Sequence, residues 1–211
     1  APRGVRAPKR LGGGEPAMGA PPEVMVVAAL RTELLFVRGP KAALGVGARS
    51  QKRLRALLAC RRPKGVVIVG YAGGLRADLR PGALVLPDLV WDAKGAVRIS
   101  GELLARARAQ LPHAQVGPLF TDERLTPLAA KAAFEGRALA VDMETSHLAR
   151  ELFRWRIPFL VGRVILDARE EAAPVGWREV LWAPRALRCS WILGRAAQAL
   201  RQALAEAVCA A

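Results

Sequence analysis

The segment from residue 138 to residue 167 constrains the fold more than any other part of the chain. It opens with a short apolar run, 138–141, which predicts a buried strand. Side chains then recur at the spacing of one packed helix face: Met143, His147, Leu148 and Leu152. A second apolar run, 159–166, predicts another strand that ends at Asp167. A strand, a helix and a strand within one crossover length are typical of a parallel sheet. We therefore expect an α/β protein.

Acidic side chains follow three of the expected strands at their carboxyl ends: Glu33, Glu144 and Asp167. A fourth apolar run, 65–70, leads into a glycine pair, Gly73–Gly74, which we interpret as a turn that lets backbone approach a ligand closely. In a mostly parallel sheet such strand ends meet in one crevice, where open α/β sheets bind ligands. We therefore expect a small-molecule site there, although each acid alone could be a helix cap or a surface charge.

The rest of the chain is consistent with one domain over residues 23–211, preceded by a tail. Residues 1–22 hold five Gly and five Pro, so we expect a flexible segment that buries little apolar surface. Further along, we expect a strand at 84–88 stopped by Pro87 and a long helix at 186–208.

Composition and charge exclude several classes of protein. The net charge of +15 is compatible with an anionic partner, but the basic residues are scattered, which favours solvated helix faces. The two histidines exclude a His-rich metal site, and no apolar run is long enough to span a membrane. Without the apolar core of a signal peptide, a cytoplasmic location is expected. We expect three reduced, mostly buried cysteines: Cys60, Cys189 and Cys209.

The order of the motifs resembles the nucleoside phosphorylase/nucleosidase superfamily, and most closely its 5′-methylthioadenosine/S-adenosylhomocysteine nucleosidase-like branch. Five blocks carry the resemblance: VVAALRTE (26–33), GVG (45–47), VGYAGGL with RPGALV behind it (69–85), VDME (141–144) and RVILD (163–167). The resemblance implies a three-layer α/β/α sandwich around a mixed, mostly parallel sheet. It also implies cleavage of the N-glycosidic bond of a purine nucleoside by water or phosphate, with an adenosine derivative such as methylthioadenosine or S-adenosylhomocysteine as the expected substrate. The VDME block equally resembles that of relatives that act on adenosylhopane or futalosine.

The resemblance also assigns expected roles by position. Glu144 and the Met143 backbone would hold the ribose hydroxyls, since a carboxylate offers two strong acceptors to a vicinal diol. Asp167 would face purine N7 as a proton donor with a raised pKa, and Glu33 would orient and deprotonate an attacking water. Four further residues would frame the base and the pocket: Tyr71, Ala72, Gly73 and Leu125.

Departures from the family pattern leave the nucleophile open. Tyr71 and Leu166 stand where small hydroxyl residues are expected, and Arg31 stands where the nucleosidases carry an acid. The added positive charge favours phosphate, which Arg31 and Arg49 could bind, as much as water. The resemblance implies no metal or organic cofactor, with phosphate as a possible co-substrate, and a homodimer. The alternative hypothesis is a non-catalytic nucleoside- or nucleic-acid-binding protein on the same scaffold, although nucleic acid is not the expected partner.

Overall fold

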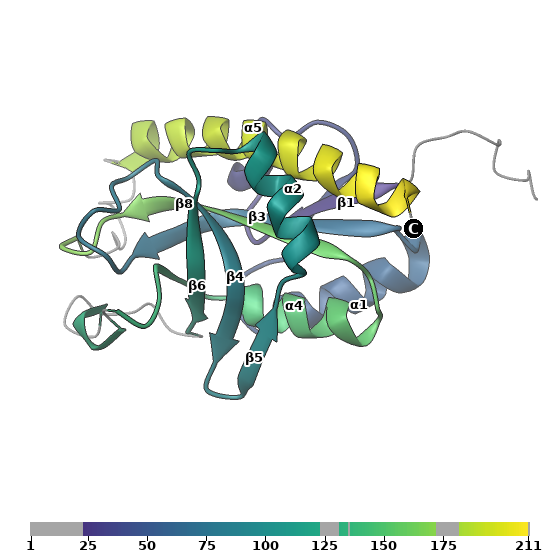
Figure 1. The fold of residues 1–211 in the computed structure, drawn as a ribbon, viewed down its shortest axis with the longest axis horizontal. Coiled ribbons are helices and arrows are strands. Elements are labelled where there is room, and N and C mark those ends of the chain that lie inside the picture. Colours follow the sequence, from purple (N-terminus) through teal and green to yellow (C-terminus); the bar gives the residue numbers. More distant parts are fainter. Residues whose placement is uncertain (1–22, 123–130, 135, 172–181, 211) are drawn as a thin grey trace, which may run out of the picture.

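A computed structural model describes residues 23–122, 131–134, 136–171 and 182–210, which form one mixed sheet with helices on both faces (Figure 1). The strands are β1 (Val24–Ala28), β2 (Lys41–Ala43), β3 (Gly65–Gly74), β4 (Leu84–Asp92), β5 (Gly95–Arg98), β6 (Gln115–Thr121), β7 (Ala140–Asp142) and β8 (Phe159–Asp167). The helices are α1 (Arg49–Arg61), α2 (Gly101–Gln110), α4 (Thr145–Arg154) and α5 (Ala183–Cys209), with short 3-10 turns η1 (Thr32–Leu34) and η2 (Ala132–Phe134). The three-layer α/β/α class expected from the sequence is confirmed.

The strand pairings bring the central strands into a closed circuit. β3 pairs with β8 in parallel, β8 with β4 antiparallel, and β4 with β6 in parallel. β6 pairs with β7 in parallel, and β7 returns to the end of β3 antiparallel. β1 and β2 extend the sheet from β3, and β5 extends it from β4. The carboxyl ends of β1, β3 and β8 therefore lie beside one another, with the end of β7 across from them.

The helices cover the sheet because each buries one apolar stripe. α5 lies across one face and packs Leu193, Ala197, Leu200 and Leu204 into the core, and α1 and α4 lie together beneath the other face (Figure 1). The two lower helices are joined by Glu151 of α4, whose carboxylate accepts hydrogen bonds from Gln51 and Arg55 of α1. This packing joins α4 to α1 on the face of the sheet opposite α5.

Two strands run further than the sequence predicts. β3 continues through Gly73–Gly74, which form the end of a strand instead of a turn, because this end pairs with both β7 and β8. β4 continues through Pro87, because a shift in register between Pro87 and Val90 absorbs the missing backbone N–H. Both differences depend on pairings between distant segments, which local propensity does not report.

Three other expectations have different outcomes. Cys189 is buried but Cys60 and Cys209 are exposed, so the expectation of mostly buried cysteines is wrong; all three are free. α5 begins at Ala183, with Pro184 in its first turn, where a missing N–H is tolerated. The expected tail, 1–22, lies outside the described residues.

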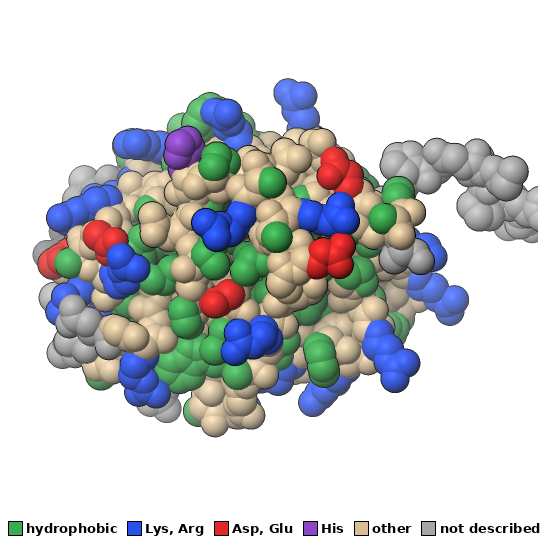
Figure 2. All heavy atoms as spheres, in the orientation of Figure 1, with side chains coloured by type: hydrophobic (Ala, Val, Ile, Leu, Met, Phe, Trp, Pro, Cys, Tyr) green, Lys and Arg blue, Asp and Glu red, His purple; other side chains and the backbone are tan. Residues whose placement is uncertain are grey.

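The surface agrees with the prediction that the basic residues are scattered and not clustered. Figure 2 shows lysine and arginine side chains spread over the visible face, with acidic side chains between them, instead of one continuous basic patch. Among the described helices, none combines the length and the apolar character needed to cross a membrane.

Candidate active site

One cavity of about 210 Å³ opens where the strand ends converge. Its wall holds the three acids that the sequence singled out, Glu33, Glu144 and Asp167, together with the end of β3. The remaining lining residues are Ala29, Leu30, Val46, Tyr71, Ala72, Gly73, Lys131, Val141, Asp142, Met143 and Leu166. The predicted convergence of Glu33, Glu144 and Asp167 on a shared crevice is therefore present in the structure.

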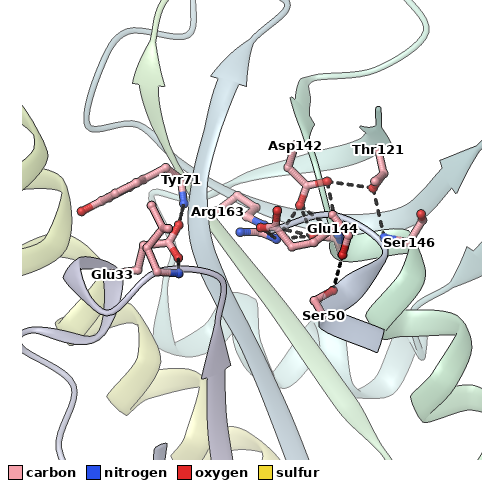
Figure 3. Close-up of polar contacts among 11 residues, drawn as sticks. Glu33, Ser50, Tyr71, Thr121, Asp142, Glu144, Ser146 and Arg163 are labelled. Atoms are coloured by element: carbon pink, nitrogen blue, oxygen red, sulfur yellow. Dashed lines mark hydrogen bonds and ion pairs between the residues drawn. The ribbon is translucent and has the colours of Figure 1, made fainter. Parts of the chain in front are cut away.

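Glu33 is held rigidly by backbone donors. It lies on η1, just after β1, and is almost fully buried. One carboxylate oxygen accepts the N–H of Leu30 at 2.6 Å, and the other accepts the N–H of Tyr71 at 2.8 Å (Figure 3). The short 3-10 turn thus bends the chain so that this carboxylate bridges β1 and β3 at the cavity wall.

The start of α4 is capped by side chains other than Glu144. Asp142, the last residue of β7, accepts the Thr145 N–H at 3.2 Å, and Thr121 Oγ1 accepts the Ser146 N–H at 3.0 Å (Figure 3). Thr121 in turn donates to Asp142 at 2.7 Å. These two groups accept the free backbone N–H groups at the start of the helix, so the Glu144 carboxylate is not needed as a cap. It lines the cavity instead.

Arg163 is the cation that links these acids, and the sequence analysis assigned it no role. Its side chain is 0% exposed in the middle of β8. The guanidinium donates to Glu144 Oε1 at 2.9 Å and to Thr145 Oγ1, and it forms an ion pair with Asp142 (Figure 3). Arg163 itself does not line the cavity; it contacts Glu144 and Asp142, which do. Its role in the structure is to neutralise and orient the acids in front of it.

Gly70 makes room for this arrangement. It pairs with Arg163 in the register of β3 and β8. A Cβ at residue 70 would collide with Arg163 Nη1 and would lie 2.8 Å from Glu33 Oε1. The absence of a side chain at this strand position therefore allows the guanidinium and the Glu33 carboxylate to approach each other.

The Arg163 guanidinium is the neighbouring cation of three buried acids, Glu33, Asp142 and Glu144. One positive charge does not balance three negative ones, so the pKa of Glu33 and of Glu144 is raised. Burial raises the pKa of Glu144 to about 8, with Arg163 acting against it and the charges of Asp142 and Glu33 adding to it. Burial also raises the pKa of Glu33, although Arg163 and the two backbone N–H groups lower it in part. Perturbed carboxyl groups in a cavity are typical of a functional site.

We expect the free energy of unfolding to decrease as pH rises from about 4.5 to about 8. The folded state binds protons at Glu144 and Glu33 that the unfolded state has released in this window, so the stabilisation is complete below the unfolded pKa and is lost through the folded one. Urea unfolding across this range measures the change. The Glu144→Gln variant, which cannot titrate at that position, should show a shallower slope, and a stability that rises with pH would contradict the assignment.

Asp167 also lines the cavity. It is the last residue of β8, opposite Gly73 of β3, at the point where the register of the two strands shifts. A Cβ on residue 73 would lie 2.9 Å from Asp167 Oδ2, so the glycine leaves space for the carboxylate. Lys131 donates a hydrogen bond to Asp167 Oδ2 and forms an ion pair with it. The sequence analysis did not identify Lys131, since an isolated lysine in an alanine-rich segment carries no local signal.

The other candidates separate into those inside and those outside the cavity. Tyr71 lines it, with its hydroxyl 2.6 Å from Ser190 Oγ and 3.2 Å from the Ala186 carbonyl of α5. Ala72, Gly73 and Met143 also line it. Arg31 and Arg49, the expected phosphate ligands, are exposed and do not line it. Leu125 lies outside the described residues.

The described residues contain no cluster of His, Cys, Asp and Glu suited to a metal ion. The cavity instead carries several acidic side chains on its wall, including Glu33, Glu144 and Asp167. Such a site can hold hydroxyl groups, exchange protons and activate a water.

A family model described as the phosphorylase superfamily matches residues 27–136. The fold is similar to that of a 5′-methylthioadenosine/S-adenosylhomocysteine nucleosidase from Helicobacter pylori, with a TM-score of 0.73 and 16% identity over 85% of this chain and 97% of that chain. Futalosine hydrolase of H. pylori gives a TM-score of 0.74 and 16% identity over 85% and 97%. The nucleosidase of S. pneumoniae, solved with the transition-state inhibitor MT-ImmA, gives 0.69 and 16% over 86% and 98%. At these identities the similarity concerns the fold.

Proposed function

This chain belongs to the phosphorylase superfamily, and on that premise we propose that it cleaves the N-glycosidic bond of a purine nucleoside, with an adenosine derivative as substrate. The observation that supports this proposal is the placement of Glu33, Glu144 and Asp167 around one cavity. The solved structures with the same fold include nucleosidases and a futalosine hydrolase, which agrees with a nucleoside as ligand.

The proposed binding mode places the sugar beside Glu144 and the base beside Asp167. The Glu144 carboxylate and the Met143 backbone accept and donate hydrogen bonds at the two ribose hydroxyls. As the C1′–N9 bond breaks, its electron pair moves into the purine, which takes up a proton at N7 from the side of Asp167. Positive charge develops on the sugar and is stabilised by the nearby acids.

We propose water as the nucleophile. Glu33 is fixed by two backbone N–H groups and, as a carboxylate, would accept a proton from water as its oxygen bonds to C1′. Among the described residues that line the cavity, Lys131 is the only cation, and it is engaged with Asp167. Arg31 and Arg49 lie elsewhere, so the described part of the cavity wall lacks the paired cationic donors expected of a phosphate site.

Base release from defined nucleosides tests this function. Incubation with methylthioadenosine, adenosine or inosine, followed by chromatography, should yield free adenine from at least one adenosine derivative. The yield should be the same with and without phosphate. Strict dependence on phosphate would overturn water as the nucleophile, and release of no base from any substrate would overturn the function itself.

We also propose a homodimer. Four large apolar side chains are exposed on the turn after β1 and on α5: Leu35, Phe36, Leu187 and Trp191. Leu35, Phe36 and Trp191 line one surface hollow, and exposed apolar patches of this kind favour association.

A further inference from the structure

Lys131 is a buried lysine whose whole hydrogen-bonding capacity is directed at one short segment. Its side chain is 2% exposed. The ammonium donates to Asp167 Oδ2, to the Ala168 carbonyl at 2.9 Å and to the Glu171 carbonyl at 2.8 Å. A lysine has three N–H donors, so none is left for a ligand. Lys131 therefore acts on the cavity through Asp167 and not by direct contact with a substrate.

The fold alone does not account for a charge at this position. Removing an ammonium and a carboxylate from water is expensive, and a buried ion pair gives little net stability compared with apolar groups of the same size. The segment that Lys131 contacts is also held from another side. Arg185 of α5 forms two hydrogen bonds to the Glu171 carboxylate, at 2.8 and 3.1 Å, and that carboxylate accepts the Ala168 N–H at 2.9 Å.

We propose that Lys131 is the positioning residue and the proton source for Asp167 at the base end of the cavity. The inference rests on the proposed function. In this ion pair a Lys131 N–H already points at Asp167 Oδ2, so a proton can pass along that hydrogen bond. When the C1′–N9 bond breaks, the proton that reaches the purine crosses from Lys131 Nζ through Asp167 Oδ2. Lys131 is left as a neutral amine and Asp167 as a carboxylate. After the base departs, the proton that Glu33 took from the attacking water returns to Lys131 through solvent.

Lys131→Met should lower kcat by about 10²–10⁴-fold, the contribution expected of general acid catalysis, with little change in KM. The sugar end of the cavity does not contact Lys131, so substrate binding there is preserved. Lys131→Arg keeps a cation and should retain a larger part of kcat. Arg185→Met is the matched control, since it loosens the same segment while Asp167 keeps its ion pair; it should keep most of the activity.

Rescue by small amines separates proton supply from packing. Lys131→Ala should regain turnover in proportion to added methylammonium, because the shortened side chain opens a space beside Asp167. Lys131→Met, which fills that space, should not respond. Equal loss in Arg185→Met and Lys131→Met, or no response of Lys131→Ala to amine, would overturn the inference while wild-type activity upholds the function. A wild-type protein that releases no base would overturn both.

Discussion

Replacing Glu144 by glutamine should lower kcat/KM for the nucleoside by about 10²–10³-fold, the range seen when one group that stabilises transition-state charge is removed. Glutamine keeps the shape of the side chain and offers one carbonyl oxygen, which Arg163 already occupies at 2.9 Å. It cannot accept hydrogen bonds from two ribose hydroxyls as a carboxylate can. It also removes the negative charge that Glu144 carries once it has lost its proton, at the place where the sugar becomes positive.

Glu151→Gln provides the matched control for this loss. Both glutamates belong to the start and middle of the same helix, and both are buried, at 4% and 2% exposure. Glu151 faces α1, where it accepts from Gln51 and Arg55, and does not line the cavity. Its variant should therefore keep wild-type kcat/KM, with circular dichroism and thermal unfolding confirming that both variants fold. Equal activity of Glu144→Gln and the wild type would remove Glu144 from the site.

The sequence predicts the acids of the site well because they follow a local rule. Glu33, Glu144 and Asp167 each follow an apolar run, and the carboxyl ends of such strands meet at one edge of a sheet. The same rule does not apply to Arg31 and Arg49. Both are close to the motifs in sequence, but the short turn η1 and the first turn of α1 direct them to solvent.

The cations of the site could not be assigned from sequence because their partners are distant. Arg163 interrupts an apolar strand, which signals a buried pair, but its partners follow from the register that sets it opposite Gly70. Lys131 reaches Asp167 across a separation of 36 residues. The end of β3 differs from the predicted turn for the same reason. Gly73–Gly74 suit a turn locally, but Asp167 and β7 pack against them and make them the end of a strand.

Arg163→Met should reduce the free energy of unfolding at neutral pH by about 3–5 kcal/mol, the usual result of removing one partner from a buried ion pair. The variant leaves Asp142 and Glu144 buried without their cation, whereas the methionine fills most of the volume. The loss should become smaller in acid, because carboxyl groups that bind protons no longer need the guanidinium. Urea unfolding at neutral and at acidic pH measures both effects.

Arg55→Met shows what a less buried cation contributes by comparison. Arg55 contacts the buried Glu151 at 2.7 Å, but its side chain is 51% exposed, against 0% for Arg163. Water can replace it, so its loss should cost much less stability than the loss of Arg163 and should depend little on pH in the neutral range. If Arg163→Met were as stable as Arg55→Met, or equally destabilised in acid and at neutral pH, the guanidinium would not be what keeps these acids together. Another group would then have to stabilise the cavity wall, because Glu33, Asp142 and Glu144 repel one another once they lose their protons.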